Sequence, residues 1–557
     1  MATVADRRCG PIEWREDSLL FRWSRGASLR CGIGLLCCGA FLLGHAFPAS
    51  AQGAYTPPAN PVAGGPPPPA NPPANAAPGG VAAIPPSWTI VPSIEVGETY
   101  NDNVNLTPKG TEAWDVITTV SPGVRISGQT QRFNLAATYN PQGLIFARNT
   151  SDNTVQERLL GTARAEVIRE ALFVETSGSM DQEFVRATGP IANTTLTTNS
   201  NLQTVTAGSA SPYLLQHAGS YFDSETRYRF STVSTSGGAV APQQINEARQ
   251  VFTSGPWFDR LAWHITGDWT KIDRLTGTSD PLGGTSGKDE LAGIDLKYRI
   301  YAGVSLIGGA AYEKIIDQTL GFEPNGPVWN AGFAYEPNPY LALSATYGRR
   351  FERSDIGANA RYTPSPDLVF RGVYAQSIQT TPAQIAGNLN QVTVGPDGTL
   401  VNSQTGLPVT VNTTTVGATN PNSVFGIISG AFLEKRFEAD IDVTRERNTY
   451  HASAYHVRQS GQAAVLSSER IVGGSLGWTR QLRPELNSIV VGAYDKATFE
   501  DGTGRIDNTY FLSIALTYTI SRTASARVSL SRSDTDSNSP GNSIVNDLVM
   551  ISLRKEF

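Results

Sequence analysis

Apolar and polar residues alternate with a period of two along much of the chain after residue 88. The apolar face of one such segment, residues 506–520, carries Ile506, Tyr510, Leu512, Ile514, Leu516, Tyr518 and Ile520. The opposite face is largely polar and includes Asp507, Thr509, Ser513, Thr517 and Thr519. Successive side chains of a β-strand point to opposite faces, so the segment predicts a two-faced strand. Residues 260–271 repeat the pattern with Leu261, Trp263, Ile265 and Trp269. In a membrane protein these apolar faces are expected to meet lipid.

Several segments place charged residues on the face opposite the apolar one. In residues 432–443 the apolar face carries Leu433, Phe437, Ala439, Ile441 and Val443. The other face carries Glu434, Arg436, Glu438, Asp440 and Asp442. The pattern recurs with Asp223, Glu225, Arg227 and Arg229, and again with Asp295, Lys297 and Arg299. One such strand also fits a soluble sandwich whose charges face water. Its repetition in strands of about 10 to 14 residues favours tilted membrane crossings.

The order of these segments predicts a barrel. About 22 of them follow one another from Trp88, and their connections alternate between tight and long. Tight turns are expected at 169–171, 255–259, 336–339, 364–367 and 521–524, and long connections at 186–201, 274–288 and 380–431. We therefore predict an all-β, transmembrane, antiparallel up-and-down β-barrel of about 22 strands, in a range of roughly 20 to 24. An even number of strands with both ends on the tight-turn side places both termini in the periplasm of a Gram-negative bacterium.

The N-terminal region has the features of a secretory signal peptide in their usual order. Arg22, Arg25 and Arg30 precede an apolar run over residues 31–47, and small residues follow at 49–51. We predict a signal peptide over 1–51. The alternative is a membrane anchor, for which a run of about 17 residues is at the short limit. Residues 52–87 are rich in Pro, Ala and Gly and predict a disordered periplasmic linker, either a spacer or a partner-binding tail. The barrel is expected over 88–557.

Composition narrows the class further. All four cysteines lie in the first 38 residues, so the mature chain has no disulfide and no cysteine-based metal site. No later stretch approaches 18 consecutive apolar residues, which leaves strands as the means of crossing a membrane. The formal net charge of -5 disfavours nucleic acid as a partner.

The chain ends on a strand-like segment whose last residue is aromatic. Val549, Ile551, Leu553 and Phe557 share one face of residues 548–557. This ending resembles the C-terminal assembly signal of outer-membrane proteins, which implies recognition by the barrel-assembly machinery. Lys555 departs from the apolar or aromatic residue often found at its place, although a long side chain near the interface reaches water.

Four passages carry a family resemblance. They are PSIEVGETYNDNV at 92–104, FLEKRF at 432–437, RNTY at 447–450 and SLRKEF at 552–557. They resemble the putative beta-barrel porin 2 family and the related outer-membrane proteins of exopolysaccharide and PEP-CTERM gene systems, over most of residues 88–557. The resemblance implies a barrel in outer-membrane lipid, with polysaccharide and periplasmic export components as partners. It brings no catalytic residues.

Motifs of enzymes and metal sites occur only in weak form. Residues 473–477 fit G-x-S-x-G, but a hydrolase needs a strand-to-helix turn followed by Asp and His, and no His follows His456. A Gly-rich barrel strand is expected there instead. Residues 283–289 depart from a phosphate loop at Leu282 and Asp289. His451 and His456 are five apart on a predicted strand and so lie on opposite faces. No cofactor, metal site or enzymatic activity is expected.

The charged residues of the polar faces are the candidates for function. In a barrel they point into the lumen, where two roles are open. They either form a constriction that filters solutes by charge and size, or they pair with one another and keep the strands in register. The candidates are Arg227, Arg229, Lys297, Arg299, Glu434, Arg436, Glu438, Asp440 and Asp442.

The expected function is an outer-membrane pore, for export of exopolysaccharide or for passive diffusion of hydrophilic solutes. One alternative is a ligand-gated receptor, which plugs its lumen with a folded N-terminal domain where this chain has the linker. Another is a barrel-borne adhesin or enzyme. A pore of about 22 strands needs a segment that narrows it, and 380–431 is the only internal one of sufficient length. Its residues 391–394 and 407–411 are expected to pack as extended pieces inside the pore or across its mouth; the alternative is a solvent-exposed surface loop.

Overall fold

The structure, a computed structural model, describes residues 87–557 apart from 187–188, 193, 239, 321–322, 396–398, 404–425, 462–467 and 501–503. The predicted signal peptide and all of the predicted linker except Ser87 lie outside the described residues. None of the helices in the described ranges is long and apolar enough to cross a membrane.

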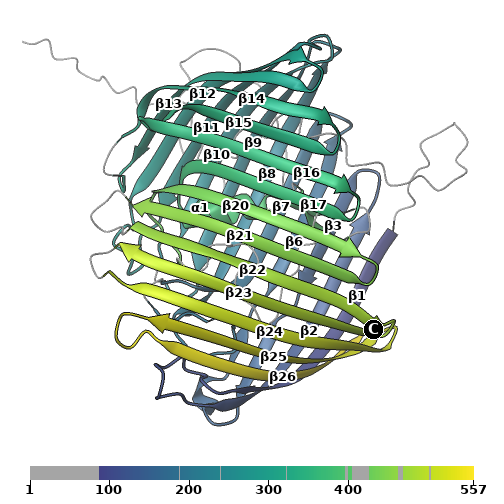
Figure 1. Cartoon of the computed structure of the whole chain (residues 1–557), viewed down its shortest axis with the longest axis vertical. Coiled ribbons are helices and arrows are strands. Elements are labelled where there is room, and N and C mark those ends of the chain that lie inside the picture. Colours follow the sequence, from purple (N-terminus) through teal and green to yellow (C-terminus); the bar gives the residue numbers. More distant parts are fainter. Residues whose placement is uncertain are drawn as a thin grey trace, which may run out of the picture. The chain divides into compact units, whose positions relative to one another are not determined.

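One antiparallel sheet of 24 strand segments closes on itself, because the first segment pairs with the last (Figure 1). The first group of segments is β1 (Ser87–Asn101), β2 (Asp115–Gln129), β3 (Phe133–Tyr139), β4 (Gln142–Phe146), β5 (Thr154–Gln156), β6 (Leu159–Ile168), β7 (Leu172–Phe184), β8 (Leu202–Ala218) and β9 (Phe222–Thr235). The second is β10 (Gln243–Ser254), β11 (Leu261–Arg274), β12 (Ser286–Tyr301), β13 (Val304–Asp317), β14 (Asn325–Asn338), β15 (Leu341–Arg350), β16 (Arg353–Ser365) and β17 (Leu368–Gln379). The third is β20 (Phe432–Arg445), β21 (Asn448–Gly461), β22 (Ser468–Arg483), β23 (Leu486–Glu500), β24 (Ile506–Ser521), β25 (Ala524–Ser537) and β26 (Ile544–Glu556).

The 24 segments form 22 barrel strands, which confirms the predicted number. Two strands are interrupted. β3 and β4 both pair with β2 and are separated by Asn140 and Pro141, and proline cannot donate to the ladder. On the side away from β2, β3 pairs with β6 and β4 pairs with β5, so β5 and β6 together form the next strand of the barrel. A short 3-10 helix, η1 (Thr150–Asp152), lies in the connection between β4 and β5.

The connections are short at one end of the barrel and mostly long at the other. All five predicted tight turns fall at the short end, and the three predicted long connections fall at the other. The long end has one short connection, Phe351 and Glu352 between β15 and β16. Both residues have positive φ, 52° and 59°, as the two central residues of a type I′ hairpin turn require. The sequence has no Gly or Asn there to signal this turn.

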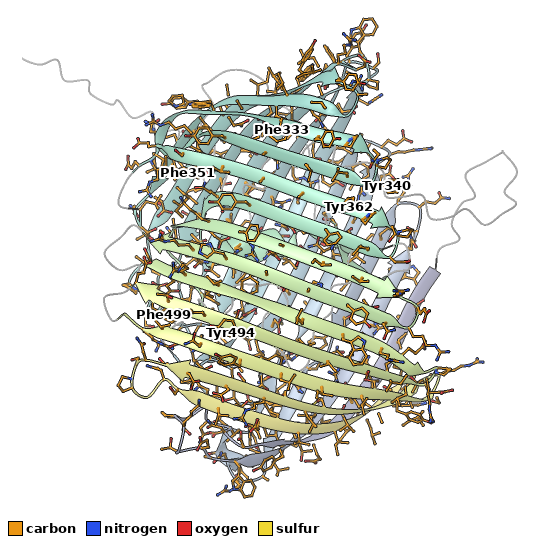
Figure 2. All side chains as sticks on the ribbon, in the orientation of Figure 1. Phe333, Tyr340, Phe351, Tyr362, Tyr494 and Phe499 are labelled. Atoms are coloured by element: carbon orange, nitrogen blue, oxygen red, sulfur yellow. The ribbon has the colours of Figure 1, made fainter. Side chains whose placement is uncertain are left out.

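Side chains alternate between the outer surface and the lumen. Tyr510, Leu512, Ile514 and Leu516 are 41–52% exposed although they are large and apolar, and Leu261 and Ile265 are similarly exposed. Trp263 and Trp269 share the outward face of β11 and are partly buried. Figure 2 shows aromatic side chains such as Phe333 and Tyr494 on the outside of the strands. A closed sheet with so much apolar surface outside is a membrane barrel, and these faces meet lipid.

The barrel closes between β1 and β26, in register from Ser93 with Glu556 to Asn101 with Leu548. Val549, Ile551 and Leu553 point outward on β26, and Phe557 follows the end of this strand. The Phe557 N–H donates to the Pro92 carbonyl at 2.9 Å. The predicted assembly signal is therefore in its expected place at the closing strand, while its recognition by assembly machinery stays a prediction.

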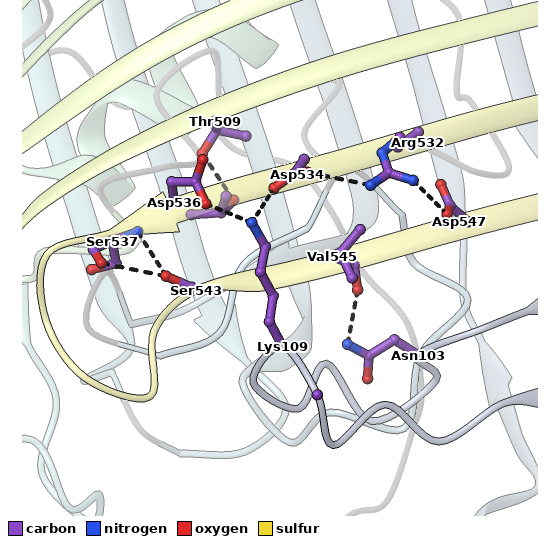
Figure 3. Close-up of polar contacts among 12 residues, drawn as sticks. Asn103, Lys109, Thr509, Arg532, Asp534, Asp536, Ser537, Ser543, Val545 and Asp547 are labelled. Carbon is purple, nitrogen blue, oxygen red and sulfur yellow. Dashed lines mark hydrogen bonds and ion pairs between the residues drawn. The ribbon is translucent and has the colours of Figure 1, made fainter.

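The pairing of β1 with β26 ends at Asn101 and Leu548. Past this pair, towards the long connections, the loop 102–114 continues the contact between the two ends of the chain (Figure 3). Asn103 donates through Nδ2 to the Val545 carbonyl at 2.8 Å. Lys109 lies between two carboxylates of β25, with Nζ 2.6 Å from Asp534 and 2.5 Å from Asp536. These contacts link a loop of the N-terminal strand to the C-terminal hairpin, and we call Lys109, Asp534 and Asp536 the closure latch.

Candidate functional site: a charged lumen narrowed by an internal loop

The connection 380–431 folds into a helix and a hairpin. α1 (Thr381–Leu389) is capped by Thr380, whose hydroxyl accepts the Ala383 N–H at 3.1 Å, and Pro382 lies in its first turn. β18 (Val392–Val394) and β19 (Leu400–Asn402) then pair with each other. The prediction of an extended piece at 391–394 is confirmed, and the helix was not foreseen. The predicted piece at 407–411 lies outside the described residues.

This loop is inside the barrel. Ile385, Ala386 and Leu389 of α1, with Val392 and Leu400 of the hairpin, are buried in one apolar cluster with the wall. The wall residues of that cluster include Leu160, Val205, Ala207, Val233, Ile245 and Ile272. Each of them alternates along its strand with outward residues, so the cluster is on the lumen side. The predicted placement inside the pore is confirmed for residues 380–395 and 399–403, and the surface-loop alternative does not describe them. We call these two ranges together the lumen insert.

Buried polar contacts fix both ends of the loop to the wall. Gln243 of β10 accepts the Thr380 hydroxyl at 3.0 Å and donates to the Ser429 carbonyl at 2.8 Å. Arg274 of β11 donates through Nε to the same carbonyl at 2.7 Å, and its Nη2 is 2.8 Å from Asp317 of β13. The Arg274 and Asp317 side chains are at most 1% exposed. The loop is thus held directly by β10 and β11 at the long end of the barrel, and the pair with Asp317 connects Arg274 to β13.

A cavity of about 690 Å³ lies between the lumen insert and the wall. Asn390, the C-cap residue of α1, is part of the lining of this cavity and accepts a hydrogen bond from the Ser209 hydroxyl of β8 at 2.6 Å. The volume is in the range of sites for small molecules. The charged residues that line it are Glu175, Asp223, Glu225, Arg227, Arg229, Glu247, Arg249, Asp268, Asp295 and Arg350.

Two of the predicted lumen residues meet in this cavity. Arg227 contacts Glu175 at 2.7 Å and Glu225 at 2.6 Å, and its guanidinium lies 3.8 Å from the centre of the Tyr213 ring. Arg229 contacts Glu247 at 3.1 Å. The pairs join β7, β9 and β10, as the register-keeping interpretation expects. They also present both charges to the cavity, so the two interpretations are compatible here.

The other seven predicted residues lie elsewhere on the lumen wall. Lys297 pairs with Glu336 at 2.7 Å, and Arg299 pairs with Asp259 of the short turn at 2.9 Å. Both are therefore near the short end of the barrel, outside the cavity lining.

β20 carries the remaining five. Glu434 is buried and accepts from Gln459 at 3.0 Å. Arg436 pairs with Glu438 at 2.9 Å. Asp442 contacts Arg371 at 2.5 Å and His451 at 2.8 Å, and Asp440 is its neighbour on the same face. The nine candidates therefore occupy three parts of the wall.

The sequence interpretation placed Asp223, Glu225 and Asp295 on charged faces together with Arg227 and Arg229, but it did not name the charged lining residues Glu175, Glu247, Arg249 and Arg350. Glu247 and Arg249 are two residues apart on β10, as are Asp223 and Glu225 on β9, so the period of two could have indicated Glu247 and Arg249. Glu175 and Arg350 could not be assigned this way, because no charged residue lies two positions away from either of them on the same strand.

The other motifs have structural roles. Ser475 of the G-x-S-x-G match lies in the middle of β22, and its hydroxyl is 2.7 Å from that of Ser453 on β21. The predicted Gly-rich barrel strand is confirmed. His451 faces the lumen beside Asp442, and His456 lies on the opposite face, as predicted. Within the described ranges there is no group of three His, Cys, Asp or Glu residues that could hold a metal ion.

Comparisons with known proteins agree with the barrel assignment. The family model described as putative beta-barrel porin 2 matches residues 422–557, the region of β20–β26, and this confirms the family resemblance for that part of the chain. A comparison with curated proteins finds no match. The closed barrel, its apolar outer surface and the porin match identify an outer-membrane, porin-like β-barrel of a Gram-negative bacterium.

The solved structures that align with the chain include siderophore receptors and an iron transporter. The FrpB iron transporter from Neisseria meningitidis (F5-1 variant) aligns at 11% identity and a TM-score of 0.46, over 85% of this chain and 83% of that one. The siderophore receptor PirA from Acinetobacter baumannii aligns at 9% identity and a TM-score of 0.42, over 84% and 80%. The siderophore receptor PirA from Pseudomonas aeruginosa aligns at 11% identity and a TM-score of 0.42, over 85% and 81%.

Proposed function

We propose that this protein is a passive pore for small hydrophilic solutes, and that the lumen insert sets its size limit. The observation that carries the proposal is the packing of α1 and its hairpin inside the barrel, above a cavity lined by charges of both signs. A barrel of about 22 strands is wider than the aqueous channels of barrels with 16 to 18 strands. The insert fills part of that width, and solutes pass through the space left beside it.

The charges of the cavity support passage of polar solutes. Arg227, Arg229, Glu175, Glu225 and Glu247 hold water at the wall and replace part of a solute's hydration shell. Because both signs are present in hydrogen-bonded pairs, the path suits neutral and zwitterionic solutes better than a single ion type. The pore is proposed to be a channel and not an enzyme.

The orientation belongs to the same proposal. We place the short turns and both termini in the periplasm and the long connections outside, because β1 begins and β26 ends at the short-turn end. Export through a cleaved signal peptide, with a mature chain from about Gln52, agrees with this orientation.

Export of exopolysaccharide is the second candidate, supported by the family resemblance of residues 92–104 and 432–437. A polymer chain needs a wider path than the cavity beside the insert, so this function requires displacement of the insert. The ligand-gated receptor alternative requires a folded N-terminal domain in the lumen. Among residues 87–557, as far as the structure describes them, the segment found in the lumen is the connection between β17 and β20.

Liposome swelling tests the proposal. Purified protein is reconstituted into vesicles, and the swelling rate is measured in neutral sugars of increasing size. We expect fast entry of monosaccharides, slow entry of trisaccharides, and loss of this size dependence when residues 385–425 are deleted. Equal exclusion of all sugars by the wild type would contradict the passive pore. Entry of long oligosaccharides into wild-type vesicles would favour polysaccharide export.

A further inference from the structure

The wall of the barrel has a gap at its long end, between β14 and the turn of the β15–β16 hairpin. The pairing of β14 with β15 stops at Trp329 with Arg349. Beyond this pair β14 continues through residues 325–328, which pair with β13 and have no register partner on β15. The gap holds a cavity of about 340 Å³ between this end of β14 and the turn residues Phe351 and Glu352. We call this cavity the side window.

The side window crosses the wall from the outer surface to the lumen. Its lining includes Trp329, which points outward, and Val328 and Glu313, which point into the lumen. Trp329 is 47% exposed and packs edge-on against Tyr347, and such outward aromatic residues mark the border of the lipid core. Residues 325–328 lie beyond that border, so the window opens to water.

A buried ion pair closes the inner side of the window. Arg350 of β15 donates to the Glu313 carboxylate of β13 through Nε at 2.9 Å and through Nη2, and the two side chains are 6% and 3% exposed. Glu313 lines the side window, whereas Arg350 lines the larger cavity beside the lumen insert. Leu291, which also lines the larger cavity, is directly opposite Glu313 on β12. The pair is therefore the partition between the two cavities.

The hairpin that carries this partition is attached to the sheet mainly on one side. The pairing of β16 with β17 begins only at Ala358 with Tyr374, so above this pair the hairpin joins the ladder through β15. Phe351 lies at its tip (Figure 2), and the Arg350 guanidinium is 4.5 Å from the centre of the Phe351 ring. A segment with few backbone hydrogen bonds to its neighbours opens locally at low cost. Movement of this tip therefore moves Arg350.

Arg350 has a second carboxylate within reach on the lumen face. Asp289 of β12 is diagonal to Glu313, because it is directly opposite Ile315, two residues further along β13. Diagonal neighbours on one face of a sheet are about 7–8 Å apart, which a long side chain spans. Asp289 is buried, and its Oδ1 has no hydrogen-bond partner in the part of the chain that the structure describes. Arg350 can thus exchange Glu313 for Asp289 without becoming a buried charge that lacks compensation.

The larger cavity is covered from the long end over β10 and β11. Thr380 contacts Gln243 and Ser429 contacts Arg274 at the ends of these two strands, above the part of each strand that lines the cavity. These contacts are buried. A solute that approaches over β10 and β11 meets them, whereas a solute that approaches over β14 meets the side window.

We propose that the side window is an entrance for small hydrophilic solutes to the cavity beside the lumen insert, and that the Arg350–Glu313 pair is its gate. This inference rests on the proposed function, which makes that cavity part of the solute path and places the long end outside. Polar side chains at the window, Asn325 and Glu352, exchange hydrogen bonds with the hydration shell of a solute. When Arg350 leaves Glu313, the window and the cavity become one continuous path.

The test places a cysteine behind the gate and a bulky residue in front of it. Leu291→Cys provides a thiol at the larger cavity, in a chain that has no cysteine after Cys38. Gly326→Trp fills the side window, because a Cβ added at Gly326 meets no atom within 4 Å. Gly267→Trp is the matched control, since Gly267 has the same free space but lies on the outward face of β11. The rate at which a membrane-impermeant thiol reagent, added to whole cells, modifies Leu291→Cys is measured in each background.

We expect Gly326→Trp to slow this modification at least about fivefold, because the entrance is then filled, and Gly267→Trp to leave it unchanged. A double variant, Arg350→Ala with Glu313→Ala, removes both side chains of the gate together and should speed the modification by about the same factor. Equal rates in Gly326→Trp and Gly267→Trp would overturn the entrance. An unchanged rate in the double variant would overturn the assignment of the gate.

Two controls keep this inference separate from the pore proposal. The heat-induced mobility shift of each variant shows whether it forms a folded barrel. Vesicle swelling in neutral sugars measures the size limit independently of the thiol reaction. Modification that Gly326→Trp slows, together with swelling that lacks a size limit, would refute the pore proposal alone. A normal size limit, together with modification that Gly326→Trp does not slow, would refute the side window alone.

Discussion

Replacing Arg274 with Met removes the cation that anchors the loop 380–431 to the wall. Arg274 is fully buried and makes two charge-assisted contacts, to Asp317 at 2.8 Å and to the Ser429 carbonyl at 2.7 Å. Removing one partner of a buried pair costs roughly 3 to 5 kcal/mol, because the other charge stays buried without compensation. Asp317 keeps hydrogen bonds from the Thr319 N–H and hydroxyl at 2.8 and 2.6 Å. We therefore expect Arg274→Met to lower the free energy of unfolding by about 3 kcal/mol, near the lower end of that range.

The assay is guanidinium unfolding of the reconstituted barrel, followed by tryptophan fluorescence. Arg299→Met is the matched control: it removes the same side chain from a pair whose members are 50% and 73% exposed, and such pairs contribute about 0 to 1 kcal/mol. A double variant, Arg274→Met with Asp317→Leu, should recover part of the loss because no buried charge is left unpaired. If Arg274→Met were no less stable than Arg299→Met, the inference that this pair fixes the loop would be wrong.

Three further predictions address the membrane face, the closure and the lumen. Ile514→Arg on the lipid face of β24, near the bilayer midplane, should destabilise the barrel by roughly 2 to 4 kcal/mol, whereas Thr517→Arg on the lumen face should have a small effect. Equal free energies of unfolding for the two variants would refute the assignment of these residues to opposite faces. Hydrogen bonds to Asp534 and then Asp536 raise the pKa of Lys109 above its ordinary 10.5, so the closure latch stabilises the barrel below that pH and is lost as the pH rises through the raised value. The melting temperature of the wild type should fall at high pH more than that of Lys109→Met, and parallel curves would show that the latch contributes nothing. Arg227→Gln with Arg229→Gln leaves the carboxylates of the cavity unpaired and should shift the reversal potential towards cation selectivity, which the outward Arg349→Gln should not do.

The wall of the barrel was predictable because each strand carries its own signal. The alternation in 506–520 and 432–443 defines two faces without knowledge of any neighbour, and the turns between such segments set the count of 22. The lumen was less predictable. No element was predicted at the start of the loop, where α1 lies, although Thr380 and Pro382 form a cap signature that indicates a helix.

Partners across strands depend on the register, which a single strand does not encode. Arg227 meets Glu175 from β7, and Arg274 meets Asp317 from β13, two strands away. The division of the predicted charges among three parts of the wall follows from the same cause. The alternation indicates that these side chains face the lumen but not at which height or beside which partner.

The central claim, that the loop between β17 and β20 narrows the pore, is tested most directly by single-channel conductance of the barrel lacking residues 385–425. A variant with Cys at Ser209 and Asn390, which are in hydrogen-bond contact at 2.6 Å, provides the control by tying the insert to β8. We predict a rise of at least about twofold in conductance for the deletion, because a barrel of this width is then open, and an unchanged conductance for the tied variant. An unchanged conductance in a correctly inserted deletion variant would contradict the account.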